Sequence, residues 1–342
     1  MTGASNPRCG RSWIGRCLGL LTILGVLGAW PTSPPGGEAR AGEKVTLGVA
    51  ATDVSKAGVF LAKETGLFEQ QGLDVDFVFF DNSIEALQTM VRGRLSVALA
   101  SGTGVVNAVA GGVEVAWIAG LVDTVPYVLV VSPDITQAAD LKGKRFGINR
   151  FGAADEFAAR FAVGRLGLDP RADVTFVQVG QQAARLAALK AQSIQASLFA
   201  PPGTVIARKL GFRELIPVAS LGLRYPFETL VSTRQFIRER PDVLRRLLTA
   251  IVMGNRAFKT RRDDGIAVIR KYLKIDDGEA LAEAYAAFSP LIQDKPYVSL
   301  EGVQLMLDEL GRGNPRIRAM QPSDLVEMQF IREMDDRGFL GR

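Results

Sequence analysis

Short apolar runs alternate with amphipathic segments along the first half of the chain. KVTLGVAA, LDVDFVFF and LSVALAS are compact apolar runs, two of them rich in β-branched or aromatic residues, as is typical of buried strands. Residues 56–71 and 83–94 instead carry apolar side chains at helical spacing, and Ser83 is the expected N-cap of the second helix. Strands and helices that alternate through short connections predict a parallel α/β sheet.

The same alternation starts a second time after an apolar strand at residues 127–135 that ends in Ser-Pro-Asp. We interpret this strand as a crossover into a second lobe, which contains a helix at residues 155–166 and another opened by Pro201 and Pro202. The chain then returns along YPFETLVSTRQF, a second crossover.

From Arg240 onward the segments are almost all helical, with apolar residues spaced by three and four. These helices are expected to complete the first lobe. The predicted fold is therefore an α/β, two-lobed clamshell. Its first lobe spans residues 42–131 and 228–342, and its second lobe spans residues 132–227. Such a clamshell closes on a small molecule by hinge motion.

The N-terminus has the features of a secretory signal peptide. Three arginines precede an apolar run at residues 17–30, and an Ala-x-Ala cleavage site ends at Ala41. The alternative is a single-pass anchor, although the run is shorter than the roughly 20 residues that a span needs. A lipoprotein is disfavoured because arginine precedes both cysteines, where lipid attachment needs a small residue. We therefore expect residues 1–41 to be removed and the protein to be periplasmic.

Composition excludes several kinds of chemistry. The chain has no histidine, and both of its cysteines lie in the expected leader. Ser-His-Asp and Cys-His catalysis therefore lack their base, and zinc sites lack their usual ligands. Removing residues 1–41 takes away four arginines and one glutamate, which lowers the net charge from +5 to 5 − 3 = +2. With no stripe of basic and aromatic residues, a nucleic-acid surface is disfavoured.

Four stretches together resemble a known family: LGVAATDVSKAGVFLAKETGLFEQQGLDVDFVFF, DLKGKRFGINRFGAADEFAARFAVGRLGLDPRADVTFVQVG, ARLAALKAQSIQASLFAPP and TRQFIRERPDVLRRLLTAIVMGNRAFK. The resemblance is to periplasmic substrate-binding proteins of ABC importers, in the NMT1/THI5-like and SsuA/TauA-like group. Members of that group deliver nitrate, taurine, alkanesulfonates, aromatic acids or thiamine-precursor pyrimidines. The resemblance implies a monomer without cofactor or catalytic activity. Its partners would be a small-molecule solute and the permease and ATPase subunits of a transporter.

Family members bind their ligand with the loops that follow the strands of both lobes. Carried over by resemblance, the candidate ligand-binding residues are Thr52, Asp53, Ser55, Lys56, Ser101, Gly102, Thr103, Asp123, Phe151, Gly152, Ala153, Ala154, Pro201 and Pro202. The chain departs from the family pattern after the motif RFG, where relatives often carry serines and this sequence has Ala153 and Ala154. Two hydroxyl donors are thus missing, which argues against a ligand held by hydroxyl groups.

The turn at Gly152 has two readings. It precedes an expected helix start, where unpaired N–H groups favour an anion, and its small residues let a ligand approach the backbone. The alternative is that Gly152 only turns the chain. Gly102-x-Gly104 after the third strand likewise suggests either a ligand-facing turn or a plain tight turn, since the third glycine of a dinucleotide fingerprint is replaced by Asn107.

The side chains near these turns also have two readings. Lys56 is a candidate partner for a ligand carboxylate or sulfonate, or an ordinary surface lysine. Asp53 and Asp123 are candidate acceptors from the ligand, or caps of the following helices. The aromatic residues Phe151, Tyr127 and Phe227 are candidates for stacking on a planar ligand, or for packing in the core or hinge.

We therefore expect an ABC-importer component that captures a small organic anion such as a sulfonate, an aromatic carboxylate or a pyrimidine-like compound. An exported module that signals its ligand to a membrane partner is the alternative. A pyrimidine synthase of the same fold is disfavoured because its active-site histidine and cysteine-rich segment have no counterpart here.

Overall fold

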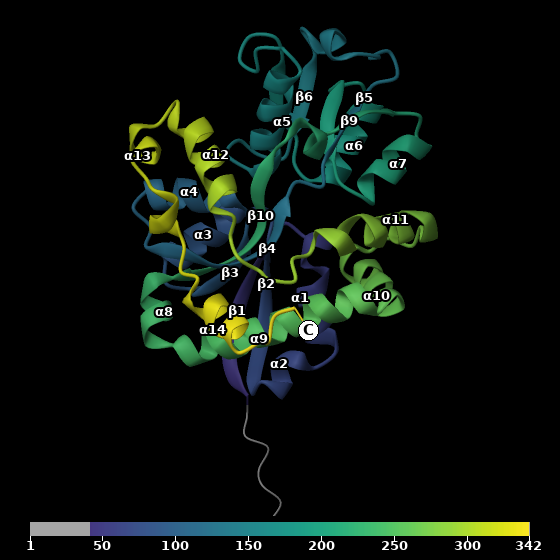
Figure 1. Cartoon of the computed structure of the whole chain (residues 1–342). Coiled ribbons are helices and arrows are strands. Elements are labelled where there is room, and N and C mark those ends of the chain that lie inside the picture. The colour runs from purple at the N-terminus through teal and green to yellow at the C-terminus, as the bar shows by residue number, and fades with distance from the viewer. Residues whose placement is uncertain (1–41, 342) are drawn as a thin grey trace, which may run out of the picture. The chain divides into compact units, whose positions relative to one another are not determined.

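The strands of the computed structural model, which describes residues 42–341, form two separate five-stranded sheets (Figure 1). The first sheet has the order β2-β1-β3-β10-β4 and the second the order β7-β6-β8-β5-β9. The strands of the first are β1 (Glu43–Ala50), β2 (Leu73–Phe80), β3 (Val97–Ala100), β4 (Val115–Thr124) and β10 (Arg224–Thr233). Those of the second are β5 (Val128–Val131), β6 (Arg145–Ile148), β7 (Thr175–Gln178), β8 (Ala196–Phe199) and β9 (Arg213–Pro217).

Each sheet is covered by helices, and we call a sheet with its helices a lobe. The second lobe holds η2 (Ala138–Leu141), α5 (Ala154–Arg165), α6 (Gln182–Lys190), α7 (Gly203–Lys209) and η3 (Val218–Leu221). The first half of the first lobe holds η1 (Val54–Lys56), α1 (Ala57–Glu64), α2 (Leu67–Gln70), α3 (Ser83–Val91) and α4 (Gly102–Ala110). Its C-terminal half holds α8 (Arg234–Glu239), α9 (Pro241–Thr260), α10 (Arg262–Leu273), α11 (Gly278–Phe288), η4 (Ser289–Leu291), α12 (Leu300–Gly311), α13 (Pro315–Arg318), η5 (Pro322–Leu325) and α14 (Gln329–Asp336). The predicted α/β two-lobed fold with a helical C-terminal completion is confirmed. The predicted leader, residues 1–41, lies outside the described residues.

The prediction of a parallel sheet was wrong for one strand in each lobe. β1 runs parallel to β2 and β3, and β6 runs parallel to β7 and β8. β10, however, is antiparallel to both of its neighbours, and so is β5. Both strands enter their sheet from the other lobe. The parallel strands run toward the other lobe, so a strand that arrives from it has to run in the opposite direction.

The predicted lobe boundaries also differ from the sheets. Residues 128–131 were assigned to the first lobe, but they form β5, which pairs with β8 and β9 in the second sheet. Where the chain returns to the first lobe, its pairing with the first sheet begins at Arg224, four residues before the predicted boundary at residue 228. An apolar strand has the same pattern in either sheet, so hydrophobicity alone does not show on which side of the crossing it pairs.

The core of the first lobe is closed by α9, the longest helix, which packs against α1. Leu244, Leu247 and Ile251 on its apolar face are fully buried, a burial worth about 1.5–3 kcal/mol for each side chain. The two helices approach so closely that a Cβ atom added at Gly254 would lie 2.3 Å from the carbonyl oxygen of Gly58. None of the helices within residues 42–341 is both long enough and apolar enough to span a bilayer.

Candidate ligand-binding site

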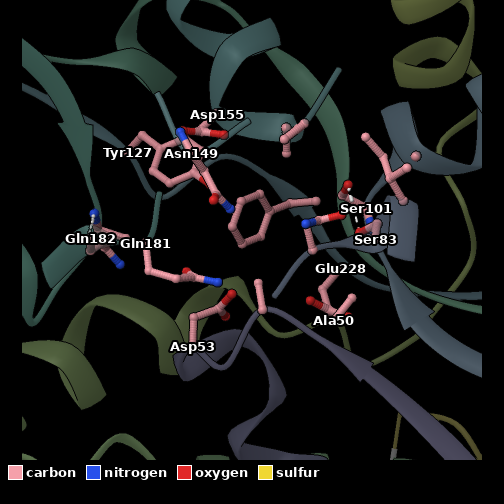
Figure 2. Close-up of a pocket in the computed structure, with 18 of the residues that line it drawn as sticks. Ala50, Asp53, Ser83, Ser101, Tyr127, Asn149, Asp155, Gln181, Gln182 and Glu228 are labelled. Carbon is pink, nitrogen blue, oxygen red and sulfur yellow. Dashed lines mark hydrogen bonds between the residues drawn. The ribbon is translucent and has the colours of Figure 1, made fainter. Parts of the chain in front are cut away.

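A pocket lies where the carboxyl ends of strands from both sheets meet, which is the usual ligand position in open α/β sheets. Its wall takes residues from the segments that follow β1, β2, β3, β6, β7 and β8, and from the two crossovers. Figure 2 shows most of these residues, whose side chains surround one space. It is lined by Ala50, Ala51, Asp53, Lys56, Asn82, Ser83, Ile84, Ser101, Gly104, Tyr127, Asn149, Gly152, Ala153, Ala154, Asp155, Gln181, Gln182, Arg185, Ala200, Phe227 and Glu228.

On the first-lobe side, Lys56 is held between two carboxylates. Its ammonium group lies 3.0 Å from Asp53 Oδ2 and is in closer contact with Glu228 Oε2, while Ser55 Oγ donates to Glu228 Oε2 at 2.9 Å. Lys56 is only 2% exposed. Burial by itself lowers the pKa of Lys56, but Asp53 and Glu228 outweigh it, so that this pKa is raised above its ordinary value. Lys56 is therefore charged and already neutralised by the protein.

The two carboxylates beside Lys56 differ in their surroundings. The side chain of Asp53 is 20% exposed, and its Oδ1 caps η1 by accepting from the backbone N–H of Ser55 at 2.8 Å. Glu228 comes from the middle of β10 and is 2% exposed, and its Oε1 has no hydrogen-bond partner among the described residues. Burial raises the pKa of Glu228 to about 7 even though Lys56 opposes the shift.

On the second-lobe side, Arg185 of α6 forms a buried pair with Asp155 of α5. Its Nη1 lies 3.0 Å from Asp155 Oδ2 and donates to the carbonyl oxygen of Leu198 at 2.9 Å. Both side chains are 4% exposed. Burial raises the pKa of Asp155, with Arg185 opposing the shift. Like Lys56, Arg185 has its counter-charge within the protein.

The start of α5, which the sequence suggested as an anion-binding site, has two carboxylates in its own first turn. Asp155 Oδ2 accepts from the backbone N–H of Asn149 at 2.6 Å, and Glu156 Oε2 accepts from that of Gly152 at 3.1 Å. Gly152 has a φ of +83°, which a glycine adopts readily, so this residue does turn the chain. It also lies in the pocket wall. The helix start is thus already in contact with negative charge.

Hydroxyl and amide groups of the first lobe are mostly engaged with each other. Asn82, and not Ser83 as predicted, is the N-cap of α3, because its Oδ1 accepts from the backbone N–H of Glu85 at 3.1 Å. Ser83 is the next residue, and its Oγ accepts from the backbone N–H of Ser101 at 2.9 Å. These contacts join the segments that follow β2 and β3, the two strands that flank β1 in the sheet, at the pocket wall.

Two aromatic rings from the two crossovers meet at the pocket. Tyr127 and Phe227 pack edge to face, with ring centroids 5.3 Å apart and an interplanar angle of 84°. Both line the pocket, so each packs in the hinge and faces the cavity at the same time. Figure 2 shows Tyr127 beside Asn149, across the pocket from Asp53 and Glu228.

Ion pairs join the two lobes on both flanks of the pocket. Arg150, which follows β6, lies 3.0 Å from Glu85 of α3. At the other flank, Arg208 at the end of α7 lies 2.7 Å from Glu283 of α11, and Lys209 contacts two carboxylates at the start of α11. All of these pairs are partly exposed, so each is worth little alone and is weakened by salt.

A family model described as NMT1/THI5 like matches residues 54–261, which is more than half of the chain. The chain belongs to the NMT1/THI5-like family. A curated relative named as a binding protein in Brucella abortus is 24% identical over 232 residues, which cover 66% of this chain and 70% of that protein.

Solved structures show that this NMT1/THI5-like chain has the periplasmic-binding-protein fold. A Bordetella bronchiseptica protein aligns with a TM-score of 0.75 at 20% identity, over 88% of this chain and 98% of that one. The alkanesulfonate-binding protein SsuA of Xanthomonas axonopodis, solved with MOPS, aligns with a TM-score of 0.69 at 19% identity, over 80% and 94%. A mutant of the desulfurization enzyme DszB, in complex with biphenyl-2-sulfinic acid, shares the fold with a TM-score of 0.63 at 14% identity, over 86% of this chain and 99% of that one.

The NMT1/THI5-like resemblance located part of this pocket. Of the carried-over residues, six line it: Asp53, Lys56, Ser101, Gly152, Ala153 and Ala154. The other carried-over residues, which are Thr52, Ser55, Gly102, Thr103, Asp123, Phe151, Pro201 and Pro202, are not in its wall. Some of them contact other parts of the protein or face solvent. Thr103 contacts the hydroxyl of Tyr225, for example, and Phe151 is 49% exposed.

Asp123 instead lies in the hinge, near the end of β4. Its Oδ1 is buried without a hydrogen-bond partner among residues 42–341. Burial raises the pKa of Asp123 to about 6, although Ser299 and Arg224 oppose the shift. Asp123 is therefore a candidate for pH-dependent stability and does not face the pocket.

Sequence reasoning missed the charged residues that come from outside the turns. Glu228 lies inside an apolar strand. Arg185 lies one turn into α6, whose sequence is that of a solvent-exposed helix, and the sequence around Asp155 indicates only that a helix begins there. The nearest available signal was the presence of a lone carboxylate within the apolar run YPFETLV, because an ionised residue in a buried strand needs a partner.

Proposed function

We propose that this protein is the solute-binding component of an ABC importer, which captures a small organic solute in the pocket between its lobes and presents it to a membrane permease. The observation that carries the proposal is that six strand ends and both crossovers, from both lobes, contribute to one pocket. A ligand held there contacts both lobes at once, so its binding energy favours the closed arrangement.

The relatives support this proposal in two ways. Proteins of the same fold include SsuA, an alkanesulfonate-binding protein, and the curated relatives are named as binding proteins. Export to the periplasm is the location that the predicted leader and such relatives favour. DszB shows that the fold also carries enzymes. We favour binding without catalysis because the chain has no histidine and no cysteine after residue 17.

The test uses the exported chain, refolded so that no co-purified solute remains. Trp117 is the only tryptophan after residue 41 and is buried in β4, so its fluorescence reports on the first lobe. An extract of bacterial metabolites is expected to raise the unfolding temperature and to reduce the radius of gyration. A ligand at a hundred times its Kd stabilises by about 2.7 kcal/mol.

A matched pair of variants assigns the effect to the pocket. Ser101→Leu fills the wall at the end of β3 and is expected to abolish the stabilisation, whereas Ser220→Leu, on the exposed surface of the second lobe, is expected to retain it. An extract that changes neither the unfolding temperature nor the radius would count against solute binding. Equal stabilisation of both variants would remove this pocket from the proposal.

A further inference from the structure

The ionisable side chains that line the pocket include more carboxylates than cations. Among the described lining residues, three are carboxylates, Asp53, Asp155 and Glu228, and two are cations, Lys56 and Arg185. Lys56 contacts Asp53 and Glu228, and Arg185 contacts Asp155. Each cation is therefore already paired, and the carboxylates outnumber the cations by one.

Carboxylates also lie at the start of α5, where an anion would bind in the second lobe. Asp155 and Glu156 accept from the backbone N–H groups of Asn149 and Gly152, at the start of α5. An anionic ligand placed there would meet two carboxylates, and like charges repel. The expectation of an organic anion depended on this helix start and on Lys56, and in the structure carboxylates of the protein lie beside both.

Among the described carboxylates of the pocket wall, Glu228 is the one with an oxygen that lacks a donor. Its side chain is 3% exposed, it lines the pocket, and its Oε1 has no hydrogen-bond partner among residues 42–341. A buried acceptor without a donor is unfavourable, and more so when it is charged. A ligand that donates a hydrogen bond to this oxygen removes that cost, and a positively charged donor also balances the excess carboxylate.

The neighbouring groups suit such a donor. Asp53, the other carboxylate on this side, is 20% exposed and lies with Glu228 at the same wall of the pocket (Figure 2). Phe227 precedes Glu228 in β10 and also lines the pocket, and an aromatic face attracts a cation. A negative wall and aromatic rings thus occur together at one pocket.

We propose that the pocket binds a small organic cation, whose protonated nitrogen, in an ammonium or amidinium group, donates to Oε1 of Glu228 beside Asp53. This proposal deepens the proposed function and rests on it, because it assigns a charge class to the solute of the same pocket. A compound whose only charged group is a sulfonate or carboxylate is expected to be excluded by the same wall.

The experiment separates a bacterial metabolite extract by ion exchange at pH 7 into three pools, retained as cations, retained as anions, or unretained. Each pool is added, in the presence of EDTA to remove metal ions, to the refolded exported chain, and the unfolding temperature is measured. Stabilisation by the cationic pool alone is expected. Stabilisation by the anionic or the unretained pool alone would overturn the cation proposal and leave solute binding intact, whereas stabilisation by none would count against both.

Two carboxamide variants show whether Glu228 is the receiving group. Glu228→Gln keeps the shape of the side chain, removes its charge and is expected to weaken binding of the cationic pool at least tenfold. Glu301→Gln, whose carboxylate is 80% exposed, is the control and is expected to bind like the wild type. Asp53→Asn provides a second variant if Glu228→Gln folds poorly. Unchanged affinity in a folded Glu228→Gln variant, or in Asp53→Asn used in its place, would contradict the assignment.

Discussion

Replacing Lys56 by methionine tests whether this lysine is an internal counter-ion. Methionine keeps an unbranched side chain but removes the charge between Asp53 and Glu228. Because Lys56 is 2% exposed and the side chain of Glu228 is 3% exposed, the remaining carboxylate stays out of water. Removing one partner of a buried ion pair costs about 3–5 kcal/mol. At about 2 °C per kcal/mol for a chain of this size, Tm is expected to fall by about 6–10 °C.

The loss is expected to depend on pH. Burial raises the pKa of Glu228 to about 7 with Lys56 present, and removing the ammonium group raises this pKa further. At pH 5 Glu228 is then protonated and tolerates burial, so the Lys56→Met variant should lose less Tm at pH 5 than at pH 8. Adding Glu228→Gln to Lys56→Met removes the orphaned charge and should recover most of the loss at pH 8. Circular dichroism during heating gives Tm for all of these variants.

An exposed lysine with two acidic partners provides the control. Lys209 lies 2.6 Å from Asp277 and 2.9 Å from Glu279, but its side chain is 43% exposed. Lys209→Met is expected to change stability by less than about 1 kcal/mol. Equal losses for Lys56→Met and Lys209→Met, or no recovery on adding Glu228→Gln, would refute the view that the protein itself neutralises Lys56. The lysine would then be free to bind an anionic ligand.

Two further predictions concern the hinge and the packing of the first lobe. Burial raises the pKa of Asp123 from about 3.8 to about 6, so the folded state binds its proton more tightly than the unfolded state does. The resulting stability is present below pH 4 and lost as pH rises through 6. In urea titrations, Asp123→Asn should remove about 1–2 kcal/mol of pH dependence, whereas Asp263→Asn at the surface should not; identical profiles would contradict this. Gly254→Ala should destabilise by about 1–3 kcal/mol, because its Cβ would lie 2.3 Å from the carbonyl oxygen of Gly58. Gly164→Ala, which meets open space within α5, should instead stabilise by up to about 1 kcal/mol in the same titration, and equal effects would exclude close helix packing as the cause.

Local patterning was enough to predict most of the fold. Each buried strand is a short apolar run, and each helix has apolar residues at helical spacing. These elements could therefore be recognised without knowledge of their neighbours in space. The direction of β10 and the sheet that holds β5 were not predicted. They depend on where the chain comes from in space, and an apolar strand has the same pattern in either orientation.

The site was predicted where it follows the strands and missed where it depends on distant partners. Ser101 and Gly152 come directly after buried strands, so position along the chain was sufficient. Lys56 was recognised as a cation but not as a paired one, because its partner Glu228 lies 172 residues later in the middle of an apolar strand. The sequence of α6 looks the same whether Arg185 is solvated or buried, so the burial of this arginine could not be predicted. The balance of acidic and basic groups in the pocket wall therefore follows only from the three-dimensional arrangement.

The pairing of β4 with β10 also bears on how the chain folds. These neighbouring antiparallel strands, with Thr124 opposite Arg224, form a hairpin whose connection is the whole second lobe. Closing a flexible connection of about 100 residues is entropically costly. Within the second lobe, however, β5 pairs with β9, which brings Val128 and Pro217 together close to the two crossings. A second lobe that folds first therefore removes most of the closure entropy, and the last two strands of the first sheet are expected to assemble after it.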